Sequence, residues 1–301
     1  MAQRPLKRLF DSVAGGLAVG TLSTVKRVDR KRSATFAAAL ARKVGPLLPE
    51  HQVGRDNLRA AFPQKSAADI EQILGGVWDN LVRVAIEFAH LDEFCVAGVG
   101  DQTPDVITYA PEMFDRYISV AQGGKAMLAF AAHLANWELP AVVGKRIGGD
   151  SAILYRRPNI DAVADLIVKL RNPLMGELIP TGLAAPVRLA RLAQSGVHVG
   201  MLVDQHFSKG VEVIFFGRRC MANPLIALLA AQTGCQICGV RTVRQPDGNS
   251  FRAEISHPLK PERDAEGHVD IARTMQAVTS VIEGWVREYP EQWLWLHRRW
   301  R

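Results

Sequence analysis

The stretch Lys125-Ala-Met-Leu-Ala-Phe-Ala-Ala-His133-Leu-Ala-Asn136-Trp137-Glu138-Leu-Pro140 decides the fold. Its first part, Ala126 to Ala132, is short and fully apolar, which is typical of a strand buried on both faces of a parallel sheet. Asn136 suits a helix N-cap, which would place Trp137 and Glu138 in the first turn of a helix. The stretch therefore predicts a strand, a tight turn and a helix, with His133 at the carboxyl end of the strand.

A histidine and a carboxylate lie five positions apart across this turn. On one continuous helix, residues five apart point about 140° away from each other, whereas a strand-to-helix turn lets them fold back on each other. We therefore expect Glu138 to hold one imidazole nitrogen of His133 and to leave the other free as a general base. Open α/β sheets place their sites at this edge. A histidine that serves only as a hydrogen-bonded structural residue is the alternative.

Apolar patterns typical of strands and of helices alternate along the rest of the chain. The predicted strands are 151–155, 197–203, 211–216, 236–243 and 251–256. The predicted helices are 70–91 (after a capping box of Ser66 and Asp69), 160–170, 186–194, 224–232 and 271–288. This alternation predicts an α/β fold with a mixed, mainly parallel sheet flanked by helices. No repeat or linker divides the chain, so we expect residues 34–301 to form a single domain.

The N-terminal segment 1–33 carries eight Lys or Arg residues and two Asp around a weakly apolar run, Leu9 to Val25. This run is short for a transmembrane span and is rich in small residues. We expect the segment to be helical and to lie in the interface of an anionic membrane leaflet. A soluble helix packed on the body of the protein is the alternative.

The composition narrows the possible partners and chemistries. A formal net charge of +7 suits an anionic partner, which would be nucleic acid, anionic lipid or an acidic protein. Cys235 and Cys238 have no second pair to complete a zinc site, so we expect buried thiols. The chain contains no G-x-S-x-G, P-loop, G-x-G-x-x-G or H-E-x-x-H motif, and we expect no cofactor and no metal. A histidine base without a protein nucleophile suits direct transfer of an acyl group to an acceptor hydroxyl.

Several stretches together resemble the bacterial lipid A late acyltransferases, the lauroyl and myristoyl transferases of lipopolysaccharide assembly. They occur in the family's order from Gly54 to Arg301, and their number makes the resemblance specific. The matching stretches are Gly54–Pro63, His133–Glu138, Tyr155–Asn159, Arg171 with Gly176–Pro180, Val203–Gln205, Gly210–Gly217, Pro290–Trp295 and His297–Trp300.

The resemblance implies an acyl donor, an acceptor and a location. The donor is acyl-acyl carrier protein, the acceptor is a lipid A precursor, and the reaction takes place at the cytoplasmic face of the inner membrane. The family's catalytic pair falls on His133 and Glu138, and two further site residues fall on Arg171 and Asp204. The alternative for Arg171 is surface solvation or structural pairing, and the alternative for Asp204 is capping of the next turn.

Two further residues are expected to bind substrate. Arg156 belongs to a matching stretch, and the alternative for it is surface solvation or structural pairing. The helix N-terminal amides near Asn136, or the Arg171 side chain, would stabilise the thioester oxygen as it gains charge. We expect no nucleic-acid binding, because the C-terminal tryptophans are better explained by packing. Two other functions stay open. One is a same-family acyltransferase acting on another glycolipid or lysophospholipid, and the other is a non-enzymatic basic protein that binds lipid or nucleic acid.

Overall fold

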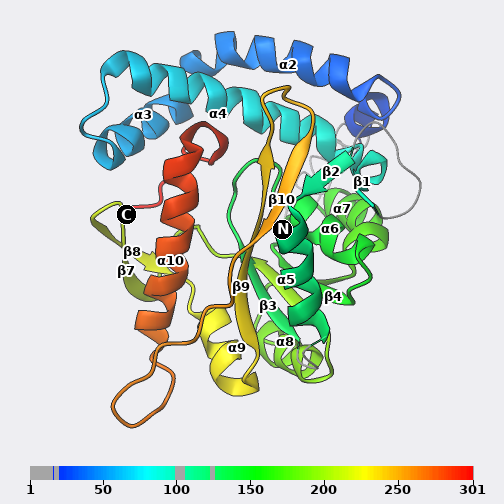
Figure 1. Ribbon diagram of the computed structural model, residues 1–301. Coiled ribbons are helices and arrows are strands. Elements are labelled where there is room, and N and C mark those ends of the chain that lie inside the picture. Colours follow the sequence, from blue (N-terminus) through cyan, green and yellow to red (C-terminus); the bar gives the residue numbers. More distant parts are fainter. Residues whose placement is uncertain (1–15, 17–19, 99–105, 123–125, 301) are drawn as a thin grey trace, which may run out of the picture.

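An eight-stranded, mostly parallel sheet forms the centre of the protein in a computed structural model that describes residues 16, 20–98, 106–122 and 126–300 (Figure 1). The strand order is β1-β2-β10-β9-β3-β6-β4-β5, and within it only β9 and β10 pair antiparallel among the described residues. The strands are β1 (Cys95–Val96), β2 (Val106–Tyr109), β3 (Met127–Ala131), β4 (Ser151–Tyr155), β5 (Glu177–Pro180), β6 (His198–Leu202), β9 (Gln236–Arg244) and β10 (Phe251–Ile255). The predicted mixed, mainly parallel α/β fold is therefore confirmed.

Helices cover both faces of the sheet and one of its edges (Figure 1). Helices α5 (Pro111–Gln122), α6 (Leu139–Arg146) and α7 (Asp161–Met175) lie on one face. Helices α8 (Ala185–Gln194), α9 (Leu225–Thr233) and α10 (Ile271–Glu288) lie on the other. Helices α2 (Arg30–Val44), α3 (Pro49–Ala61) and α4 (Ala67–Phe88) form a separate layer over the carboxyl edge of β3, because α4 contacts the turn that follows this strand.

The N-terminal layer is helical, as predicted, and the capping box of Ser66 and Asp69 begins α4. Most of the predicted membrane segment 1–33 lies outside the described residues, so its place in a membrane stays a prediction. None of the helices that the structure describes is long and apolar enough to cross a bilayer.

One predicted strand does not join the main sheet. Residues 211–216 form β7 (Val211–Phe215), which pairs with β8 (Arg218–Ala222) in a separate hairpin that packs against α10. The two residues between them, Phe216 and Gly217, both have positive φ, which fits the tight hairpin turn that matches strand twist. Phe216 tolerates this conformation because its ring is buried against Phe62 and Trp295. The short hairpin return was not apparent because β8 begins with two exposed arginines.

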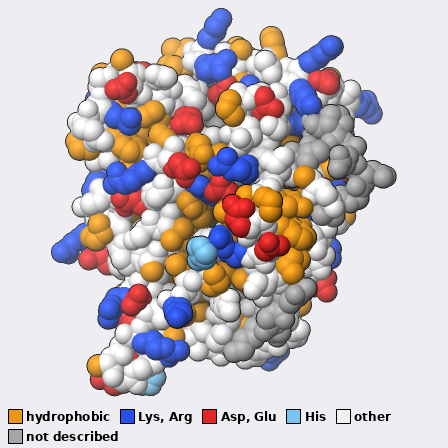
Figure 2. Space-filling model, viewed as in Figure 1, with side chains coloured by type: hydrophobic (Ala, Val, Ile, Leu, Met, Phe, Trp, Pro, Cys, Tyr) orange, Lys and Arg blue, Asp and Glu red, His pale blue; other side chains and the backbone are white. Residues whose placement is uncertain are grey.

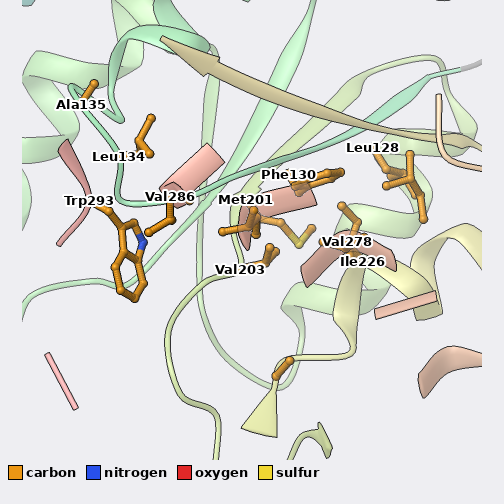
Figure 3. Close-up of a cluster of buried hydrophobic side chains, with 14 of the residues drawn as sticks. Leu128, Phe130, Leu134, Ala135, Met201, Val203, Ile226, Val278, Val286 and Trp293 are labelled. Atoms are coloured by element: carbon orange, nitrogen blue, oxygen red, sulfur yellow. The ribbon is translucent and has the colours of Figure 1, made fainter. Parts of the chain in front are cut away.

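The main hydrophobic core lies between the sheet and helices α9 and α10. Charged side chains of both signs are interspersed over the face shown in Figure 2, whereas apolar side chains fill the interior. Figure 3 shows Leu128 and Phe130 of β3 beside Met201 of β6, Ile226 of α9 and Val278 of α10. Because side chains alternate along a strand, the intervening positions of β3 face α5 and α6 instead.

The paired cysteines of the Cys235-x-x-Cys238 motif are buried and free, as predicted. Burial raises the pKa of the Cys238 thiol to about 12. This sulfur therefore stays protonated and is part of the packing.

A test of the core concerns Gly239, which lies on β9 opposite Phe130. A Cβ atom there would come within 2.7 Å of Phe130 Cζ and 2.8 Å of Trp285 Cη2, whose rings stack on each other. We expect Gly239→Ala to lower the free energy of unfolding by about 1–3 kcal/mol. Gly75→Ala in α4 is the matched control, since its Cβ meets nothing within 4 Å and should gain about 0.5–1 kcal/mol. Urea denaturation of both variants measures the change in the free energy of unfolding. An equal change in the two variants would show that Gly239 is not tightly packed.

Candidate active site

The turn after β3 is held in an unusual backbone conformation. Ala135 has a φ of 49°, which is uncommon for a residue other than glycine. Its amide donates to the Gln292 carbonyl at 2.8 Å, and its carbonyl accepts from Asn80 Nδ2 at 3.1 Å. Contacts from two distant segments thus stabilise the turn that presents His133.

Asn136 anchors this turn and does not cap the helix, so the N-cap prediction was wrong. Helix α6 begins at Leu139, and Trp137 and Glu138 precede it. Asn136 is buried because its Nδ2 donates to Glu87 Oε2 at 2.9 Å and its Oδ1 accepts from the Glu138 amide. These bonds occupy its side chain within the protein, which favours a positioning role over direct substrate binding.

A buried ion pair lies beneath Asn136. The carboxylate of Glu87 accepts from both terminal nitrogens of Arg244, and Arg244 Nε donates to Asn80 Oδ1 at 2.9 Å. Both charged side chains are almost fully buried, and removing one partner from such a pair leaves a costly uncompensated charge. The pair therefore ties α4 and β9 to the turn at a fixed geometry.

His133 forms a buried hydrogen-bonded pair with Asp204. The Nδ1 atom lies 2.8 Å from Asp204 Oδ1, and the His133 amide donates to Oδ2 at 2.8 Å. Trp293 Nε1 also donates to Oδ2 at 2.8 Å. Because an ionised carboxylate only accepts, Nδ1 carries the proton of the neutral ring, and Nε2 of that neutral ring keeps its lone pair. Strands β3 and β6 are parallel neighbours, so their carboxyl ends bring the two residues together.

The pair shifts the pKa of both groups. Burial by itself would lower the pKa of His133, but the charge and hydrogen bond of Asp204, with the charge of Glu138, raise it above its ordinary value. The pKa of Asp204 lies well below its ordinary range, since the interactions with His133 outweigh the opposing effect of burial. The carboxylate is consequently charged at neutral pH and stabilises the imidazolium.

Glu138 binds Arg171 rather than the histidine. Its two carboxylate oxygens accept from Arg171 Nε, at 2.8 Å, and from a terminal nitrogen of the same guanidinium. The expectation that Glu138 would hold the imidazole was therefore wrong, and Asp204 occupies that place. The guanidinium also lies over the Phe88 ring, 5.2 Å from its centroid. Glu138 thus fixes the orientation of the Arg171 guanidinium.

A cavity of about 630 Å³ opens from this group along the sheet. Residues of β3 and β6 form its floor, and residues of α5 and α6 form its walls. The floor residues Ala129, Ala131 and Gly200 have small side chains or none, so they leave the cavity open above the sheet. The lining includes His133, Glu138 and Arg171 at one end, the floor residues Met127, Ala129, Ala131, His198 and Gly200, and Met113, Phe114, Tyr117 and Val143 from the helices.

Arg156 is the remaining predicted site residue, and three residues that were not predicted as site residues lie next to His133 or Asp204. Arg156 is exposed and lines the cavity. Gln205 Nε2 lies 3.4 Å from His133 Nε2, which places its amide beside the unprotonated nitrogen. The Trp137 ring lies 5.2 Å from the imidazole centroid. Trp293 is a partner of Asp204 that the sequence interpretation had assigned only to packing.

The chain belongs to the family described as bacterial lipid A biosynthesis acyltransferase, whose sequence pattern matches residues 12–301. The resemblance that the motifs indicated is thereby confirmed over essentially the whole chain. This family defines an acyltransferase of lipid A biosynthesis, and it implies a lipid A precursor as acceptor. Comparison with curated proteins finds no match. Within the described part of the chain, no cluster of three or more potential ligand side chains forms a metal site.

The pair of His133 and Asp204 predicts a particular pH dependence. We expect His133 to act as a base, which must be neutral to accept a proton, so its raised pKa should place the acid limb of kcat/KM above the ordinary histidine pKa. Asp204→Asn removes the carboxylate charge, and we expect this limb to move to lower pH while kcat/KM falls by at least about 10²-fold. The nearby His297 has a pKa that burial lowers, so it titrates below this limb. An acid limb unchanged in Asp204→Asn would show that another group is the base.

Proposed function

We propose that the protein transfers a fatty acyl chain from acyl-acyl carrier protein to a hydroxyl of a lipid A precursor at the cytoplasmic face of the inner membrane. The observation that carries the proposal is the position of His133. Its Nδ1 is held by a buried carboxylate while its ring borders a large, mostly apolar cavity. A base at the end of an acyl-sized cavity suits acyl transfer to a hydroxyl.

In this mechanism the Nε2 atom of His133 accepts the proton of the acceptor hydroxyl as its oxygen attacks the thioester carbonyl carbon. The charge of Asp204 stabilises the imidazolium that forms. When the tetrahedral intermediate collapses, the carbon–sulfur bond breaks and the carrier's thiolate leaves. The imidazolium returns its proton to that sulfur, so the base is restored and no covalent acyl-enzyme is needed.

Arg171 is placed to stabilise the negative charge on the thioester oxygen. It lines the cavity together with His133, and its side chain is mostly buried, so its charge is screened little by water. The bidentate contact with Glu138 restricts the guanidinium to one orientation. We assign Glu138 the role of positioning Arg171, in place of orienting the base. Arg156, exposed on the rim, is assigned to the phosphate of the acceptor or to the acidic carrier protein.

Alanine substitutions test these assignments. We expect His133→Ala and Glu138→Ala each to lose at least about 10²-fold in transfer rate, because the first removes the base and the second releases Arg171. His268→Ala is the matched control, since His268 is exposed and remote in sequence from the cavity lining. Purified variants would be assayed with acyl-carrier-protein donors, with circular dichroism to check folding. Near-wild-type turnover in folded His133→Ala would contradict the mechanism.

The acceptor is tested separately. Mass spectrometry of the lipid A from a host that lacks and then regains this protein should show one acyl chain lost and restored. Transfer to a lysophospholipid or another glycolipid with unchanged lipid A would favour the alternative acceptor.

The cavity predicts selectivity for acyl chain length. Each buried methylene contributes about 0.8 kcal/mol, and one methylene in a closed pocket discriminates by about 1–3 kcal/mol. We therefore expect one preferred length with its neighbours tolerated. Ala129 lies in the middle of β3 on the cavity floor, so Ala129→Leu should shift the preference to shorter donors. Competition among donors of different lengths measures this shift, and an unchanged profile would show that the chain binds elsewhere.

A further inference from the structure

Helix α2 presents its large apolar side chains to solvent. Phe36 and Leu40 are 74% and 53% exposed, Val44 follows at the same spacing, and Leu47 beyond the helix is 81% exposed. Residues four apart lie on the same face of a helix, so these side chains form one outward stripe, which we call the α2 stripe (Phe36, Leu40, Val44 and Leu47).

The opposite face of α2 buries two alanines and Arg30, but none of the large apolar side chains of the helix. Ala34 and Ala38 are buried, and the helix packs closely along α4 through this face. A surface helix of a soluble protein normally buries its large apolar side chains and exposes its polar ones. Helix α2 instead leaves Phe36 and Leu40 exposed, and packing among the residues that the structure describes does not cover them.

The charge of α2 identifies the kind of partner. The helix contains five basic residues and no acidic one, and the exposed Arg32 and Lys43 lie at the two ends of the stripe. Figure 2 shows basic and hydrophobic side chains together along the upper edge, where Figure 1 places α2. A second copy of this face would bring like charges together, whereas anionic lipid headgroups attract them.

We propose that the α2 stripe docks the protein on an anionic phospholipid bilayer, with Phe36, Leu40, Val44 and Leu47 entering the headgroup boundary and Arg32 and Lys43 contacting lipid phosphates. This inference rests on the proposed function, because that function places the acceptor in a bilayer. It extends the membrane contact beyond segment 1–33. Docking here also turns the carboxyl edge of the sheet toward the lipid, because α2 packs on α4 and α4 contacts the turn after His133.

The proposal is tested by the environment of residue 40 in the full chain. Leu40→Cys is labelled with an environment-sensitive fluorophore in a Cys95→Ser background, because the other three cysteines are buried. Leu228→Cys is the matched control, since Leu228 is 47% exposed on α9, at the opposite end of the molecule (Figure 1). Vesicles of phosphatidylcholine with phosphatidylglycerol should shift the emission of the label at 40 to the blue and let lipid-borne quenchers reach it. The label at 228 should not respond. Vesicle-bound protein with an unresponsive label at 40, or no vesicle binding, would overturn the proposal.

A second measurement separates the stripe from the rest of the chain. We expect Phe36→Ser with Leu40→Ser to lower the vesicle partition coefficient at least about tenfold, because two large apolar side chains no longer leave water. A wild-type dimer that this variant converts to a monomer, with unchanged vesicle binding, would show that a second copy covers the stripe. Neither readout needs turnover. A protein without transferase activity that still docks through residue 40 would therefore refute the proposed function alone.

Discussion

The buried ion pair of Glu87 and Arg244 is the constraint on which the site depends. Two charges inside a protein are tolerated only when their remaining hydrogen-bonding groups are satisfied. Here Asn80 and Asn136 supply those bonds, and the same two side chains hold the backbone after β3. The left-handed conformation of Ala135 is thus imposed by the surrounding structure. A change in this pair would move His133 even though neither charged residue borders the cavity.

That constraint explains why the two carboxylates of the site have different partners. The turn directs the Glu138 side chain toward Arg171 of α7, while the end of β6 delivers Asp204 beneath the imidazole. Asp204 is the more buried of the two and accepts from His133 and Trp293. Asp204 therefore sets the tautomer and raises the pKa of His133, and Glu138 sets the position of the Arg171 guanidinium. Each carboxylate of the site thus has its own partner, because Asp204 contacts His133 and Glu138 contacts Arg171.

The sequence predicts the positions of the site residues better than their pairing. His133 and Asp204 are recognisable because each follows a buried apolar strand, and the ends of parallel strands share an edge. Their contact was not predictable because residues alone do not reveal that β6 lies beside β3 in the sheet. Glu138 was assigned to the histidine because it is near in sequence, but the conformation of Ala135 depends on Gln292 and Asn80, which are distant in the chain. Strand β7 was recognised as a strand, yet its membership of a separate hairpin depends on packing against α10.

In the proposed mechanism, Asp204 fixes the proton of the neutral His133 ring on Nδ1 and leaves Nε2 as the base. The most direct measurement is the tautomer of His133, read by NMR from ¹⁵N-labelled histidine in the wild-type protein, with His133→Ala to assign the signals. At a pH where the ring is neutral, the account predicts a protonated Nδ1 and an unprotonated Nε2. A neutral ring with its proton on Nε2 would contradict the account, because that nitrogen could not accept the proton of the acceptor hydroxyl.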